Sequence, residues 1–127
     1  MAKRRSIEIQ GFGHSNPIPA ASVVGNVLMS SIIGPRDPDT GKVPESIDAQ
    51  LACLFRHAKA IVEAAGGTTS DILKMNFWIR EPHKRDAINA EWVKMFPDAA
   101  ARPARHTQAL TGAGEALVQC DVTAVIG

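Results

Sequence analysis

The chain has no tyrosine and only two cysteines among its 127 residues. Cys53 falls in a helical pattern and Cys120 in a strand pattern, with no CxxC pair, so we expect both thiols to be buried and reduced. No apolar run approaches the roughly 18–20 residues needed to cross a bilayer, and we expect no membrane partner. The basic segment Lys3-Arg4-Arg5 is followed by the alternating segment Ser6-Ile7-Glu8-Ile9-Gln10 instead of an apolar run, which argues against a secretory signal, so we expect a cytoplasmic protein.

The chain also lacks an excess of charge of either sign. Fourteen basic residues stand against 13 acidic ones, and the net charge of +1 predicts no nucleic-acid partner. The four histidines show no ligand spacing, and the short glycine loops lack the helix and lysine of a phosphate site. We therefore expect a small-molecule partner, no metal and no cofactor. The length predicts a single domain over residues 1–127.

Hydrophobic periodicity predicts strands, a helix, a strand, a helix and two more strands. The predicted elements are a strand over 6–10, a hairpin over 23–31 that turns at Gly25-Asn26, a helix over 46–65, a strand over 71–80 that buries Leu73, Met75, Phe77 and Ile79, a helix over 84–96, and strands over 102–110 and 117–125. A turn-rich loop covers 35–42. The first helix is long enough for a crossover between parallel neighbours. This order predicts an α+β fold, a two-layer sandwich in which two helices cover a mixed sheet of about six strands.

The last two strands suggest a site. A hairpin closed around residues 111–115 would pair Arg105 with Asp121, on one face with Thr107 and Gln119. Such a polar face could hold a small acid. An ordinary exposed ion pair, contributing only about 0.2–1 kcal/mol, is the simpler interpretation. A register slip of one residue would set Arg105 opposite Cys120 instead.

Six segments in order resemble one known family. They are Gly25-Asn26 before an apolar strand, Pro38-Asp39-Thr40-Gly41, the run from Ala58 to Gly66, Asp71-Ile72-Leu73-Lys74, Ile88-Asn89-Ala90 and Pro103-Ala104-Arg105. Over roughly residues 16–126 the chain is similar to the reactive intermediate deaminases, the Rid or YjgF family of imine and enamine hydrolases, whose fold is chorismate-mutase-like.

The resemblance implies a homotrimer with clefts between subunits, where Arg105 holds the carboxylate of a 2-imino or enamine acid. A guanidinium binds a carboxylate bidentately, which fixes orientation as well as affinity. Imine hydrolysis then needs a positioned water and a proton transfer. Asp121 stands where the family commonly has glutamate. It either performs this acid-base chemistry or only orients Arg105, and we weigh the two roles equally.

Other positions in the cleft differ from the family pattern. Ile18 falls where the family usually has an active-site tyrosine, and Ile32 replaces the glycine after the serine that matches Ser31. Thr107 replaces a frequent cysteine, while Asn89 keeps the family's helix asparagine, either as a cleft residue or as an ordinary surface residue. These changes predict a bulkier, more apolar cleft. The alternatives to a deaminase are a non-catalytic binder of small carboxylic acids and, ranked last, an endoribonuclease.

Overall fold

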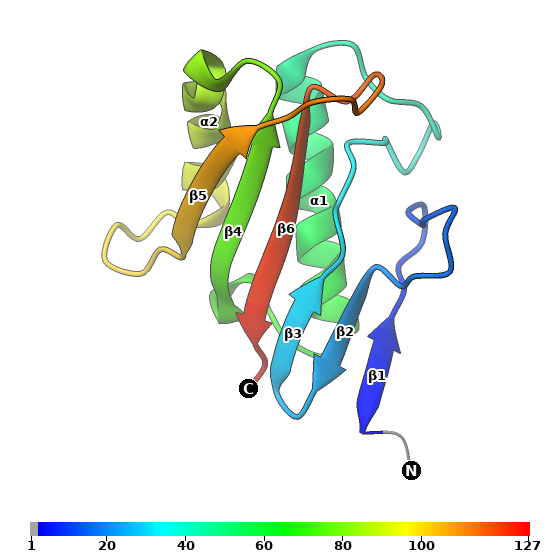
Figure 1. Cartoon of the computed structure of the whole chain (residues 1–127). Helices are drawn as coiled ribbons and strands as arrows, with labels where there is room; N and C mark the ends of the chain where they lie inside the picture. The colour runs from blue at the N-terminus through cyan, green and yellow to red at the C-terminus, as the bar shows by residue number, and fades with distance from the viewer. Residues whose placement is uncertain (1–2) are drawn as a thin grey trace.

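The computed structural model describes residues 3–127 apart from the side chain of His83, and in it two helices cover one face of a mixed six-stranded sheet (Figure 1). The strands lie in the order β1-β2-β3-β6-β4-β5. The elements are β1 (Arg4–Ile7), β2 (Ala21–Val24), β3 (Val27–Ser30), α1 (Ile47–Ala64), β4 (Ile72–Ile79), α2 (Ile88–Met95), β5 (Ala104–Ala109) and β6 (Val118–Val125). The predicted α+β two-layer sandwich is confirmed.

The early hairpin and the long helix form where the sequence predicts them. Gly25 takes the positive φ of 62° that the turn between β2 and β3 requires. Ser46 caps α1, because its side-chain oxygen accepts a hydrogen bond from the amide of Ala49. Gly66, with a φ of 93°, follows the end of the helix.

The second helix is shorter than predicted. Pro82–Ala87 form a 3₁₀ segment, and α2 proper begins only at Ile88. Ile88, Trp92 and Phe96 are buried, while Ala87 and Met95, which the helical period also directs toward the core, are only partly buried. This segment carries the chain from β4 to its parallel neighbour β5.

Strand β4 buries mainly one side, as predicted, but the assignment of Leu73 to that side is wrong. The pairing with β6 shifts between Ile72 and Lys74, so a bulge takes Leu73 out of the alternation. Leu73 is 59% exposed, whereas Met75 and Phe77 are fully buried.

The predicted hairpin between the last two strands is wrong. Strand β4 lies between them, parallel to β5 and antiparallel to β6. Consequently Arg105 pairs with Met75, and Asp121 pairs with Asn76. Strand β6 buries every second side chain, which suits the middle of a sheet, whereas the polar strand β5 suits an edge. The connection over 110–117 therefore crosses the end of β4 (Figure 1).

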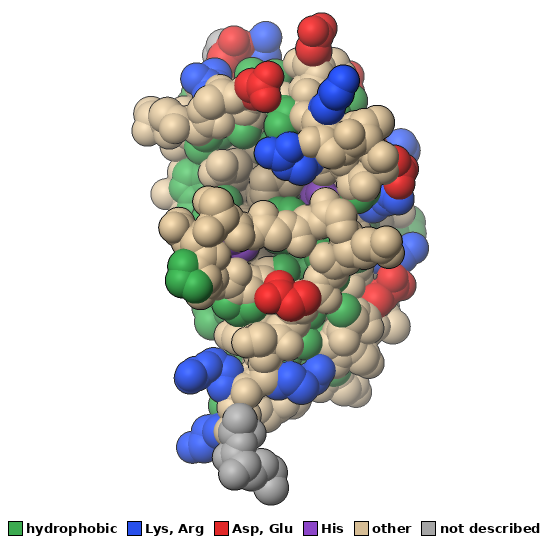
Figure 2. Space-filling model, turned by 90° about the vertical axis from the view of Figure 1, so that its right-hand side faces the viewer, with side chains coloured by type: hydrophobic (Ala, Val, Ile, Leu, Met, Phe, Trp, Pro, Cys, Tyr) green, Lys and Arg blue, Asp and Glu red, His purple; other side chains and the backbone are tan. Residues whose placement is uncertain are grey.

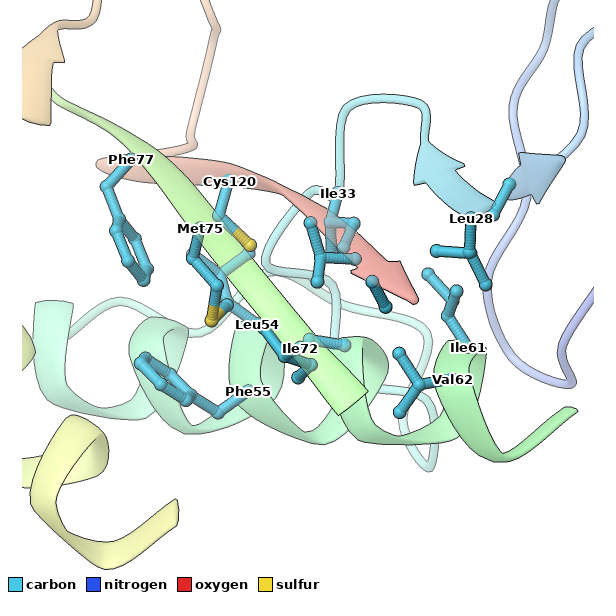
Figure 3. Close-up of a cluster of buried hydrophobic side chains, with 14 of the residues drawn as sticks. Leu28, Ile33, Leu54, Phe55, Ile61, Val62, Ile72, Met75, Phe77 and Cys120 are labelled. Carbon is cyan, nitrogen blue, oxygen red and sulfur yellow. The ribbon is translucent and has the colours of Figure 1, made fainter. Parts of the chain in front are cut away.

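The core fills the space between the sheet and α1 (Figure 3). In this view Leu54 and Phe55 of the helix lie under Met75 and Phe77 of β4. Cys120 lies in the same layer, and both cysteines are buried and unbridged, as predicted. The other face of the sheet, which we call the open face, has no helix over it (Figure 1).

Candidate active site

Arg105 points to the helix side of the sheet, because its neighbour Met75 faces the core. Its guanidinium carbon lies over the ring of Trp92, 5.1 Å from the centroid. Burial lowers the pKa of Arg105 below its ordinary value, and the nearby carboxylate of Asp86 opposes this effect. Among the described side chains, which leave out that of His83, the guanidinium has no hydrogen-bond or close ion-pair partner. It is thus a half-buried cation whose N–H donors are free.

Thr107 shares the strand of Arg105, and Asn89 lies on the helix that carries Trp92. Thr107 pairs with the buried Phe77, so it shares the face of Arg105, as the sequence predicts. Asn89 is exposed on α2, about one turn before Trp92. Both therefore lie on the helix side of the fold or in the helix layer, as Arg105 does.

Asp121 lies on the opposite, open face, so the prediction that it shares a face with Arg105 is wrong. Its neighbour Asn76 donates a side-chain hydrogen bond to Oδ1 of Asp121 at 2.9 Å. Asn76 in turn pairs with His106 of β5, which gives a polar row across three strands. No contact joins Asp121 to Arg105 within the described chain, because the sheet separates the two side chains. Asp121 therefore does not orient Arg105 of its own chain.

Ser31, Ile32 and Ile18 lie in the loops beside β2 and β3. The hydroxyl of Ser31 donates a hydrogen bond to the carbonyl oxygen of Pro19 at 2.8 Å, so it is already occupied in holding the two loops together. Ile32 is 36% exposed and lines a pocket of ≈ 370 Å³ together with Gln119. Ile18 is exposed at a neighbouring pocket of ≈ 560 Å³.

The structure adds two residues to these sites that the sequence did not indicate as site residues. Trp92 packs in the core, and its ring also contacts Arg105. His14 lines both loop pockets, and its Nε2 is buried without a hydrogen-bond partner in residues 3–127. A tryptophan at the border of an amphipathic helix is a usable signal for the first. The sequence gives no signal for the second.

The described residues include no group of three or more histidine, cysteine, aspartate or glutamate side chains that could hold a metal ion. Within the same residues, no helix is both long and apolar enough to cross a membrane. The structure separates the main predicted site residues into two groups, Arg105 and Thr107 on the helix side of the sheet and Asp121 on the open face. One chain alone does not present both groups to one small ligand.

Comparisons with protein families and with known proteins point to one family. The family described as Endoribonuclease L-PSP matches residues 14–126. A RutC family protein of Haemophilus influenzae is 35% identical over 82 residues, which are 65% of this chain and 63% of that protein. The 2-iminobutanoate/2-iminopropanoate deaminase of Escherichia coli is 35% identical over 83 residues, 65% of each chain. The aligned part thus spans a little under two thirds of these relatives.

Solved structures agree over nearly the whole fold. The YjgF gene product of Escherichia coli superposes with a TM-score of 0.85 at 27% identity, covering 95% of this chain and 98% of that one. Escherichia coli TdcF with bound serine gives a TM-score of 0.87 at 26% identity, covering 97% and 99%. With the family match over residues 14–126, these findings show that the chain belongs to the Endoribonuclease L-PSP family, the YjgF or Rid family.

Proposed function

We propose that the protein hydrolyses 2-imino and enamine acids to 2-keto acids and ammonia, with Arg105 binding the substrate carboxylate. The observation that carries the proposal is the half-buried guanidinium of Arg105, which has no hydrogen bond or close ion pair within the described residues. A relative named 2-iminobutanoate/2-iminopropanoate deaminase and a neighbour solved with serine, which has a carboxylate, support the same chemistry.

The reaction consumes one water. The water oxygen bonds to the imine carbon as the C=N π bond breaks, and one water proton reaches the nitrogen to give a carbinolamine. The hydroxyl proton of the carbinolamine then passes to the nitrogen as the C–N bond breaks, which releases ammonia and leaves the 2-keto acid. In the proposal Asp121 accepts the water proton and later returns a proton to the nitrogen. The hydrogen bond from Asn76 holds the carboxylate of Asp121 in place for this role. Arg105 supplies binding and orientation, which are large contributions when the substrate is already electrophilic.

The proposed cleft lies between subunits of a homotrimer. Arg105 and Asp121 lie on opposite faces of one sheet, so a cleft that contains both needs them from two copies. The open face carries exposed apolar side chains on adjacent strands, among them Val27, Met29 and Val125, which a second copy would cover. Ile18 and Ile32 would make such a cleft apolar beyond the carboxylate, which favours imino acids with bulky apolar side chains.

The test follows ammonia release from 2-imino acids that an amino-acid oxidase generates in place, across several side chains, for the wild type and Asp121→Asn. We expect wild-type acceleration over the spontaneous reaction, and a loss of about 10²- to 10⁴-fold on removing the proton acceptor. If the wild type accelerates no imine but still binds 2-keto acids, the protein is a carboxylate binder and the deaminase proposal is wrong.

A further inference from the structure

Trp92 is held rigidly by aromatic neighbours. It is only 8% exposed, and its ring packs edge-on against Phe96 at 4.9 Å and Phe77 at 6.3 Å between centroids. Phe77 stacks on Phe55 of α1 at 5.6 Å, and Figure 3 shows these two rings facing each other in the core. The indole ring is therefore anchored to both layers of the fold.

The outer side of this ring contacts Arg105. A cation over an indole ring is attracted by the negative face of the π-system, and burial strengthens that attraction. This contact does not occupy the N–H groups of the guanidinium, which can still donate hydrogen bonds to oxygen. No other described residue hydrogen-bonds to the group, so the donors stay available to an incoming anion.

We propose that Trp92 is a positioning residue, which holds the Arg105 guanidinium over its ring so that its N–H donors meet a substrate carboxylate in one orientation. This inference rests on the carboxylate-binding role proposed for Arg105. An arginine side chain has several rotatable bonds, and fixing it before binding removes an entropic cost that binding would otherwise bear. Without the ring, the side chain of Arg105 would be free to turn toward Asp86, the carboxylate whose charge acts on the pKa of Arg105.

The test is a double-mutant cycle on equilibrium binding of pyruvate, a 2-keto acid of the product class, measured by calorimetry. The variants are Trp92→Leu, Arg105→Ala and the pair, with Trp92→Phe as the conservative change. We expect Trp92→Leu to weaken pyruvate binding by about 2- to 30-fold, the range typical of a cation–π contact, and Trp92→Phe to restore most of it. In the Arg105→Ala background the Trp92 change should have no further effect.

Phe55→Leu is the matched control. It removes a ring from the same aromatic cluster, and this ring does not contact Arg105. Equal loss of pyruvate binding in Phe55→Leu and Trp92→Leu, or an undiminished Trp92 effect without Arg105, overturns the positioning role. If Trp92→Leu does not fold, Trp92→Met takes its place in the cycle, because it fills the same buried position without a ring. Imine turnover is measured in parallel: binding coupled to Trp92 without turnover leaves this inference standing and overturns only the deaminase.

Discussion

The imidazole of His57 lies in the interior, under the loop that carries Arg36. It is 1% exposed, its Nε2 lies 2.7 Å from the carbonyl oxygen of Arg36, and its ring packs on Phe12 at 5.0 Å. Because the partner is a carbonyl oxygen, Nε2 is the protonated donor. Burial lowers the pKa of His57 below its usual value, and the bond to Arg36 only partly opposes this.

We expect the stability of the protein to fall as the pH drops below about 6.5, the ordinary histidine pKa. In that range the unfolded chain takes up a proton at His57 and the folded chain does not, so the free energy of unfolding decreases toward the lowered folded pKa. Above about pH 7 the residue contributes no pH dependence. Urea unfolding of the wild type and His57→Gln at pH 7.5, 6.5 and 5.5 measures the effect, and equal slopes with pH in both proteins contradict it.

Among the elements, the local ones follow from the sequence and the pairing of the last strands does not. The hydrophobic period and the residues at the helix ends locate α1 to within a residue at each end, because Ser46 and Gly66 are local signals. The order of strands in a sheet depends on contacts between distant segments, and glycines after Leu110 suit a hairpin as well as the longer crossing that forms. That error carried into the site, since it placed Arg105 and Asp121 on one face.

Candidate site residues could therefore be named from the sequence, but their arrangement could not, and their roles stay predictions. Resemblance to the family indicated Arg105 and Thr107, and the structure places both on one face of β5. The contact with Trp92 could not be foreseen, because the predicted hairpin puts Arg105 on a polar face of the sheet and no local pattern joins a strand arginine to a helix tryptophan.

The crossing between β5 and β6 is held by one buried side chain of α1. Nε2 of Gln50 donates to the carbonyl oxygens of Pro44 at 2.7 Å and Glu115 at 3.1 Å, and its Oε1 accepts from the amide of Leu117 at 2.7 Å. Gln50 is 1% exposed, so water does not replace these bonds easily. The helix thereby fixes the start of β6.

We expect Gln50→Leu to lower the free energy of unfolding by about 1–3 kcal/mol, since it leaves partly buried amide and carbonyl groups unpaired. Amide exchange at Leu117 should also accelerate. Gln10→Leu is the control, because Gln10 is exposed. Urea unfolding and hydrogen exchange test both points; a stability like that of the wild type would show that the crossing does not depend on Gln50.

At the scale of the whole molecule, charge gives no support to RNA cleavage as the main activity. Figure 2 shows the side next to β1, where acidic and basic side chains are mixed and basic ones gather only at the lower end beside the N-terminus. That end corresponds to the exposed basic segment Lys3-Arg4-Arg5. RNA cleavage by the purified protein that is lost in Arg105→Ala or in an Asp121 variant would contradict the low rank given to the endoribonuclease.

The proposed trimer makes a prediction about the open face. Met29 is 60% exposed there, beside Thr123 of β6. We expect the wild type to sediment at micromolar concentration as three copies, and Met29→Glu to shift it to single chains, because a buried unpaired carboxylate is costly. Val93→Glu on the helix layer is the control and should leave the assembly intact. A wild type that sediments as one chain contradicts the interface cleft.

The central claim, that Arg105 binds the carboxylate of the reacting acid, is tested most directly by kcat/KM for a 2-imino acid in three proteins. These are the wild type, Arg105→Ala and Arg4→Ala, the last removing an exposed arginine at the opposite edge of the sheet (Figure 1). We predict a loss on the order of 10²-fold in Arg105→Ala, from losing a charge-assisted bidentate contact, and no change in Arg4→Ala. Turnover in Arg105→Ala equal to that of the wild type would contradict the account.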